Sequence, residues 1–163
     1  MSIDVLSVIG AYWGEPQLRD FLAALQFPAA KARVIPVDDY ASYLQNQRLG
    51  VELTFQILAR LKVQPRSYPD GALVLMNIRL YGEKRNSFTP YAGVLPLGLH
   101  FGDTRQALID KLGPPDLVTD LVSQLRWDYD RYCLFARFSA AGELTIVAVQ
   151  TPVVASTKPA PAR

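Results

Sequence analysis

The sequence predicts an α+β fold in which helices pack on one face of a mostly antiparallel sheet. Several segments alternate apolar and polar residues with a period of two, as half-buried strands do. Two other segments carry apolar residues at helical spacing and stop at proline. Short turns join the last strand candidates, as antiparallel hairpins require. The 163 residues, half of them apolar, allow one core. We therefore expect a single α+β domain over 1–151.

Two helices are predicted near the N-terminus, over residues 3–12 and from Pro16 to about Gln26. Proline suits the first helical turn because its missing N–H has no intrahelical partner there. Pro28 then stops the second helix. Four apolar residues at i, i+3, i+4 and i+7 give the second helix one buried face: Leu18, Phe21, Leu22 and Leu25.

The next segments are predicted strands. Lys31 to Pro36 is either a short strand or an extended connection, and Asp38-Asp39 opens a strand that runs to about Gln47. Leu49-Gly50 is a turn. Residues 51–56 alternate apolar and polar side chains, which indicates a strand with one buried face.

The strongest strand candidate runs from Ala72 to Tyr81, after a loop over 58–71 that is rich in proline and charge. Strict alternation divides its side chains between two faces. The predicted core face holds Val74, Met76, Ile78 and Leu80, and the predicted outer face holds Asn77, Arg79 and Tyr81.

A third helix, over 103–112, has the clearest start and stop. We expect Asp103 to cap it by accepting a hydrogen bond from the Gln106 N–H. Gly113 supplies a left-handed residue at its end, and the prolines that follow cannot continue a helix. Three strands are expected after it, over 121–129, 131–139 and 143–150, with turns at Asp130 and Ala140–Gly142.

The two halves of the chain echo each other, which suggests tandem helix-plus-strands repeats over 1–85 and 93–151. Apolar helix residues recur at a separation of 87 residues, and an Asp-Tyr-x-x-Tyr pattern recurs at a separation of 89. The first recurrence pairs Phe21, Leu22 and Leu25 with Leu108, Ile109 and Leu112, and the second pairs Asp39, Tyr40 and Tyr43 with Asp128, Tyr129 and Tyr132.

From Pro152 onward the composition changes to Ala, Ser, Thr, Lys and Pro, so 152–163 is expected to be a disordered tail.

Charge and composition exclude several classes of function. A formal net charge of +2 without a basic stripe argues against nucleic-acid binding. No window approaches the ~18 to 20 apolar residues of a membrane span, so we expect no membrane insertion. The first ten residues lack the basic region of a signal peptide, which predicts a cytoplasmic protein. The lone Cys133 cannot form an intramolecular disulfide and is expected to be a buried small hydrophobe.

Catalytic and metal chemistry find little support. His100 is the only histidine, so neither a multi-histidine metal site nor a relay of two imidazoles can form. No Gly-x-Ser-x-Gly elbow or glycine-rich phosphate cradle is present. The carboxylates Asp38-Asp39, and Asp128 with Asp130, fit strand edges and turns better than acid–base catalysis. We expect no catalytic residue, no cofactor and no metal, and a hydrolase using His100 is the least favoured alternative.

The polar face of the predicted sheet is the best candidate for function. It carries arginine and aromatic side chains, the residue types that dominate the centres of protein interfaces. The alternative is that one or two of these residues are covered by helices or by the 58–71 loop. The candidate interface comprises Glu52, Thr54, Asn77, Arg79, Tyr81, Phe135 and Arg137, and Gln56, Thr145 and Val147 are expected on the same face.

The segment from Leu95 to Pro115, together with the later Trp127-Asp128-Tyr129 and its paired strands, resembles the Leu-Gly-x-Pro helix-and-sheet repeats of the β-lactamase-inhibitor-protein-like fold. It also resembles small cytoplasmic proteins of bacteria, some of which are immunity partners of secreted toxins. The resemblance implies a protein that binds other proteins through a sheet face and its loops, with no catalytic set. Gln26-Phe27-Pro28 departs from the pattern because it lacks the glycine of Leu112-Gly113-Pro114.

The function expected from these observations is that of an immunity protein, which neutralises a bacterial toxin by direct binding. The weak positive charge disfavours a highly basic nuclease as the target, since an acidic inhibitor would suit such a target better. The alternative, from another class, is a structural or adaptor component of a bacterial secretion or envelope system. No sequence feature sets the oligomeric state.

Overall fold

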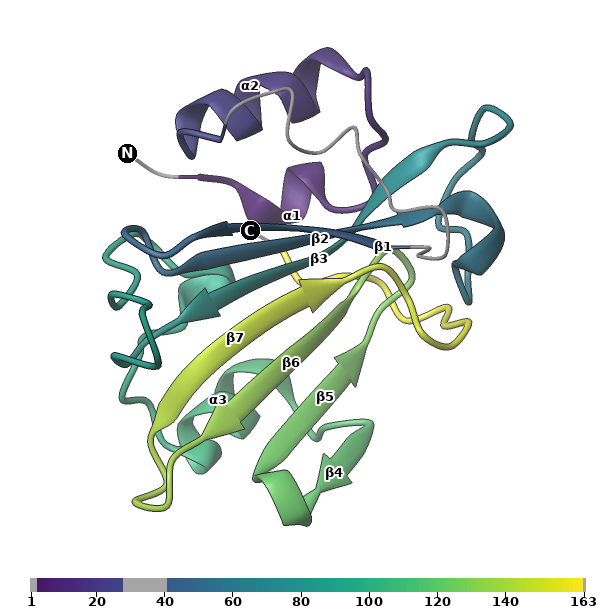
Figure 1. Cartoon of the computed structure of the whole chain (residues 1–163). Coiled ribbons are helices and arrows are strands. Elements are labelled where there is room, and N and C mark those ends of the chain that lie inside the picture. Colours follow the sequence, from purple (N-terminus) through teal and green to yellow (C-terminus); the bar gives the residue numbers. More distant parts are fainter. Residues whose placement is uncertain (1–2, 28–40, 163) are drawn as a thin grey trace.

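The computed structural model describes residues 3–27 and 41–162, and these form an antiparallel sheet with few helices (Figure 1). The α+β class and the mostly antiparallel sheet are therefore confirmed. The strands, in the order in which they lie in the sheet, are β1 (Ala41–Asn46), β2 (Val51–Ile57), β3 (Leu73–Tyr81), β7 (Leu144–Gln150), β6 (Cys133–Phe138), β5 (Gln124–Asp128) and β4 (Leu117–Thr119). The helices are α1 (Val5–Val8), α2 (Pro16–Ala24) and α3 (Arg105–Leu112), with short 3-10 turns at Leu58–Arg60, Pro96–Gly98 and Asp120–Val122.

Helix α2 begins at the proline, as predicted, and its Leu18, Phe21 and Leu22 are buried, as is Leu25 at its C-cap. Helix α1 is shorter than predicted because Gly10 adopts a left-handed φ of 81° and redirects the chain. The residues after it pair with the first half of β3 instead: the Leu75 N–H donates to the Ala11 carbonyl at 2.8 Å, and the Trp13 N–H to the Leu73 carbonyl at 2.7 Å. The segment Lys31 to Pro36 and the residues Asp38-Asp39 lie outside the described residues.

Strand β3 contains a bulge that overturns the predicted division of its side chains. Thr54 lies opposite Asn77 and Phe55 lies opposite Leu75, so Met76 has no residue opposite it on β2. An unpaired residue of this kind reverses the alternation of side chains. Leu75, rather than Val74 or Met76, therefore joins Ile78 and Leu80 in the main core.

Helix α3 is capped by Thr104, one residue later than predicted. The Thr104 hydroxyl accepts a hydrogen bond from the Ala107 N–H at 3.1 Å. The Asp103 carboxylate closes the preceding turn, where it accepts from the His100 N–H at 2.9 Å and from Lys111 at 3.2 Å. Burial opposes ionisation of Asp103, but these two donors outweigh it and hold the pKa of Asp103 below its usual value. The helix ends at Gly113, with φ at 82°, as predicted.

The cap assignment predicts the effect of replacing Thr104 with alanine. We expect Thr104→Ala to lower the free energy of unfolding by about 1 kcal/mol, because the Ala107 N–H loses its partner at the helix start. Urea denaturation measures the change. Thr104→Ser keeps the hydroxyl and is expected to be close to the parent protein; equal losses in both variants would contradict the cap.

One buried cluster joins the helices to the sheet. It contains Val5 and Val8 of α1, Leu18 of α2 and Leu108 of α3. In Figure 1, α1 and α2 lie over β1, β2 and β3, and α3 lies behind β6 and β7 in this view. Strand residues of the same cluster include Leu53, Phe55, Leu75, Ile78, Leu80, Leu125, Trp127, Leu134, Ala136, Val147 and Val149.

The order of elements is helix then strands in both halves, and the last strand of each half, β3 or β7, pairs with the other. The Asp-Tyr-x-x-Tyr pattern does not mark equivalent positions, however. Tyr43 lies within β1 and is 62% exposed, whereas Tyr129 and Tyr132 flank the β5–β6 turn and are buried. Asp39 and Tyr40 lie outside the described residues. The tandem repeat remains a prediction.

The C-terminal half differs from the sequence prediction at both of its ends. Short strand β4 was not predicted, and β5 begins only at Gln124 because Ser123 is left-handed, with φ at 49°. Residues 152–162 form no helix or strand, yet they contact the β5–β6 turn, which differs from the expected disorder. The Asp130 N–H donates to the Lys158 carbonyl at 2.8 Å, and the Lys158 ammonium pairs with Asp116.

The loop over 58–71 was predicted from its proline and charged residues, and Tyr68 links it to the N-terminal segment by a hydrogen bond. Its hydroxyl donates to the Gly10 carbonyl at 2.7 Å. The Arg66 guanidinium lies 5.5 Å from the ring centres of both Tyr12 and Tyr68 and pairs with Glu15 at 2.7 Å. Burial, opposed by Arg66, raises the pKa of Tyr68 to about 12.

The raised pKa of Tyr68 predicts that the protein loses stability at alkaline pH. The pKa of Tyr68 in the folded protein lies above the unfolded value of 10.0. Its contribution to the free energy of unfolding is therefore fully present below pH 10 and is lost as the pH rises through about 12. We expect Tyr68→Phe to lower the free energy of unfolding at neutral pH by about 1 kcal/mol, through the lost hydrogen bond, and to weaken this alkaline loss. Denaturation at several pH values tests both effects. Tyr43→Phe, at an exposed position, should change neither.

Candidate functional site

The polar face of the sheet is defined here as the side that carries three rows of directly opposed residues on β2, β3, β7, β6 and β5. The backbone register sets these rows, since opposed residues in antiparallel strands project to the same side. The first row is Tyr81, Ile146, Arg137 and Gln124; the second is Glu52, Arg79, Ala148, Phe135 and Arg126; the third is Thr54, Asn77, Gln150, Cys133 and Asp128.

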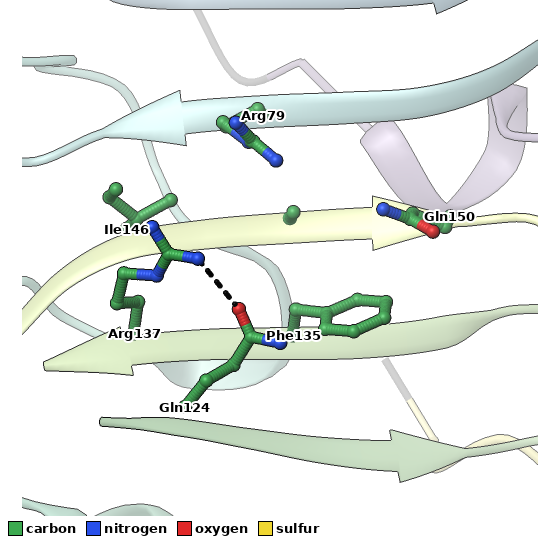
Figure 2. A pocket seen from close by; sticks show the side chains of 7 residues that line it. Arg79, Gln124, Phe135, Arg137, Ile146 and Gln150 are labelled. Atoms are coloured by element: carbon green, nitrogen blue, oxygen red, sulfur yellow. Dashed lines mark hydrogen bonds between the residues drawn. The ribbon is translucent and has the colours of Figure 1, made fainter. Parts of the chain in front are cut away.

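At the centre of this face lies a hollow of about 120 Å³, which we call the arginine hollow (Figure 2). Its floor is apolar, because Ile146 and Ala148 on β7 line it and both are almost fully buried. Arginines from the flanking strands stand on either side of β7. The hollow is lined by Arg79, Gln124, Phe135, Arg137, Ile146, Ala148 and Gln150.

Three of the predicted interface residues, Arg79, Phe135 and Arg137, meet in this hollow. Glu52 lies beside them: its carboxylate is 3.9 Å from an Arg79 nitrogen and accepts a hydrogen bond from Gln45 at 2.6 Å. These four residues lie on the polar face as the sequence predicted.

The other three predicted interface residues are buried and cannot contact a partner without rearrangement. Thr54 and Asn77 are only 5% and 4% exposed. The Phe88 ring covers Tyr81, with 4.4 Å between the two ring centres. The predicted accessibility of Thr54, Asn77 and Tyr81 is therefore wrong, because the chain covers them itself.

Val147 was also expected on the polar face, but it points into the main core. Arg137 lies opposite Ile146 and Phe138 lies opposite Leu144, so Thr145 sits at a bulge. The register instead places Ile146, Ala148 and Gln150 on the polar face. Sequence reasoning missed these three because residues 146–149 are all apolar, and alternation cannot assign a face in such a run.

The charges in the arginine hollow are only partly compensated. Arg137 donates to the Gln124 side-chain oxygen at 3.2 Å, and no carboxylate of the described residues lies within ion-pair distance of it. Burial, together with the nearby Arg79 and Arg85, lowers the pKa of Arg137. The guanidinium remains charged at all physiological pH values. The site thus concentrates positive charge over an apolar floor.

Arg79 has spare hydrogen-bonding capacity as well. Its Nε is buried without a hydrogen-bond partner among the described residues. Its closest carboxylate, Glu52, is beyond hydrogen-bond distance at 3.9 Å. The two arginines are suited to binding an anionic group, which a guanidinium recognises through paired N–H donors.

Residues considered for chemistry elsewhere are not assembled into a site. His100 is exposed, and its hydrogen bonds with Asp103 run through its backbone N–H and carbonyl. Asp128 pairs with Arg126 at 2.9 Å, and Asp130 is exposed in the turn. Within residues 3–27 and 41–162, no group of three or more His, Cys, Asp or Glu side chains is placed to hold a metal ion.

Cys133 is fully buried on the polar side of β6, with its sulfur 3.5 Å from the Thr151 carbonyl. Burial raises the pKa of its thiol to about 12, so the thiolate is not formed at neutral pH. The prediction of a buried small hydrophobe is confirmed. No helix in the described part of the chain is long and apolar enough to cross a membrane.

Comparison with known proteins does not assign this chain to a family. No family model and no curated protein matches this chain. Among solved structures, the chain is similar to a DUF4309 family protein, YjgB, from Bacillus subtilis subsp. subtilis str. 168. The two are 17% identical over 82% of this chain and 76% of that chain, with a TM-score of 0.40. At this level of similarity, no property is transferred from one protein to the other.

Proposed function

We propose that this chain is an immunity protein that neutralises a bacterial toxin by binding it directly through the polar face. The observation that carries the proposal is the arginine hollow, where Arg79, Arg137 and Phe135 converge on a pleated sheet. Arginine and aromatic side chains supply most of the binding energy at protein interfaces. A sheet anchored by one large core holds them in fixed positions before a partner arrives, which lowers the cost of ordering them on binding.

The proposal includes an arrangement in which all the helices pack on one face and leave the polar face to the partner. Its support is that residues of α1, α2 and α3 share one buried cluster with alternate residues of the strands. The proposal also includes the tandem repeat, supported by the order of elements, and the cytoplasmic location.

The charge of the arginine hollow indicates an acidic contact surface on the toxin. Arg137 has no carboxylate partner among the described residues, and Arg79 and Arg85 add positive charge beside it. Complementary charge gives specificity and speeds association. An acidic rim on the toxin would meet this requirement, which agrees with the expectation that a highly basic nuclease is not the target.

The alternative function, a structural or adaptor component of a secretion or envelope system, is favoured by a different observation. At the far edge of the sheet, β4 has no neighbour on its outer side among the described residues, and apolar side chains surround it. An exposed edge strand is a template for pairing with another chain. The exposed apolar side chains are Leu117, Val118, Leu121 and Val122.

The two functions separate in one experiment. The tagged chain is recovered from its native bacterium, the bound protein is identified, and that protein is expressed with and without this chain. We expect a single stoichiometric partner that stops growth when expressed alone and is harmless when expressed with this chain. A partner from secretion or envelope machinery that is not toxic would support the adaptor instead. Recovery of no stoichiometric partner would contradict both.

A further inference from the structure

We propose that the arginine hollow is a carboxylate-binding site, filled by an Asp or Glu side chain of the protein partner that inserts between the guanidinium groups of Arg79 and Arg137. The proposal rests on the proposed function for the identity of the partner. Its ligand chemistry, however, can be tested on this chain alone.

The register of the sheet builds the site. Arg79 lies directly opposite Ala148 on one side of β7, and Arg137 lies opposite Ile146 on the other. Figure 2 shows the side chains of both arginines in the hollow, with the Arg137 guanidinium extending over β7. Ala148, which carries only a methyl group, lines the hollow together with both arginines and leaves room there for a small ligand group.

The uncompensated charge calls for an anion. Among the described residues, Arg137 donates only to the neutral Gln124 amide, and two further arginines lie near it. Arg79 keeps a buried Nε without an acceptor in the same part of the chain. Bringing like charges together in a half-buried hollow is unfavourable, so an anion that accepts hydrogen bonds from both guanidinium groups relieves the repulsion.

The surroundings favour a carboxylate on a peptide. A carboxylate has two oxygens in one plane, which match the paired donors of a guanidinium. The neighbouring groups are apolar, with Phe135 beside the hollow and Ile146 in its floor. They suit the aliphatic part of an Asp or Glu side chain and an apolar residue next to it, whereas a free phosphate ion would gain nothing from them.

The test follows the side-chain Nε–H signals of Arg79 and Arg137 by NMR while a blocked peptide, acetyl-Leu-Glu-Leu-amide, is added to the full chain. We expect a saturable shift of both signals. The matched acetyl-Leu-Gln-Leu-amide, which has the same shape without the charge, should bind at least about ten-fold more weakly. Inorganic phosphate forms a third arm and should give no saturable shift of these two signals.

Two variants locate the site. Ala148→Leu fills the hollow with a larger side chain, and Arg79→Gln removes one guanidinium. Each substitution should weaken the affinity for the Glu peptide by at least about ten-fold. The Arg79 variant covers the case in which the larger side chain at position 148 disturbs folding. Equal affinity for the two peptides, a saturable response to phosphate but not to the Glu peptide, or unchanged binding by Arg79→Gln would each overturn the inference.

The peptide test and the search for a partner fail independently of each other. If the chain recovers a toxin partner but does not bind the Glu peptide, this inference alone would be overturned. Peptide binding without any partner would overturn the proposed function alone.

Discussion

Arg137→Glu is expected to weaken binding of the protein partner by at least about thirty-fold, the loss that accompanies removal of an interface hot spot worth about 2 kcal/mol. The substitution removes a guanidinium from the centre of the polar face and places a carboxylate where we expect the partner to present one. Repulsion between like charges then adds to the lost hydrogen bonds. Titration calorimetry with the partner recovered from cells measures the change.

The matched control for this variant is Arg19→Glu. It makes the same change of charge on an exposed residue of α2, which contributes to the core on the other side of the sheet. We expect its affinity to stay within about two-fold of the parent, since isolated surface charges contribute little. Equal weakening by the two variants would mean that overall charge, rather than the arginine hollow, governs binding.

Trp127→Ala is expected to have the largest effect on stability, lowering the free energy of unfolding by about 3 to 5 kcal/mol. Trp127 is 0% exposed, belongs to the main core, and donates from Nε1 to the Gly113 carbonyl at 2.9 Å. The side chain thus joins β5 to the end of α3. A loss of this size is a large part of the roughly 5 to 15 kcal/mol that stabilises most domains, and urea denaturation measures it.

Two further variants separate the contributions of Trp127. Trp127→Phe keeps much of the ring but removes the N–H donor, so we expect an intermediate loss. Leu121→Ala, at a side chain that is 97% exposed, should leave stability nearly unchanged. A loss below about 1 kcal/mol for Trp127→Ala would show that this side chain does not anchor the core.

The fold was largely predictable because most elements are started or ended by residues within or next to them in the sequence. Pro16 starts α2, Gly113 ends α3, and the hairpin turn at Ala140–Gly142 joins β6 to β7 as expected. The cap of α3 was misplaced by one residue, since Asp103 and Thr104 are both good capping residues. The competing hydrogen bond from the His100 N–H, which decides between them, is a property of the folded turn.

The candidate site was only partly predictable. Phe135 and Arg137 lie on β6, whose pairing with β5 and β7 runs without a register shift up to Arg137, and the sequence placed them correctly. The bulges at Met76 and Thr145 reverse the alternation on β3 and β7, and no local pattern marks either of them. The burial of Tyr81 depends on Phe88, a residue in a different segment. Accessibility is therefore set by contacts that sequence periodicity does not describe.

The central claim is that the partner covers the polar face at the arginine hollow. Hydroxyl-radical footprinting of the complex tests it most directly, because it measures the accessibility of individual side chains. We predict that Phe135 loses reactivity when the partner binds, while Leu121, near the far edge of the sheet, keeps its own. Protection of Leu121 with no change at Phe135 would contradict the claim and place the partner at the β4 edge.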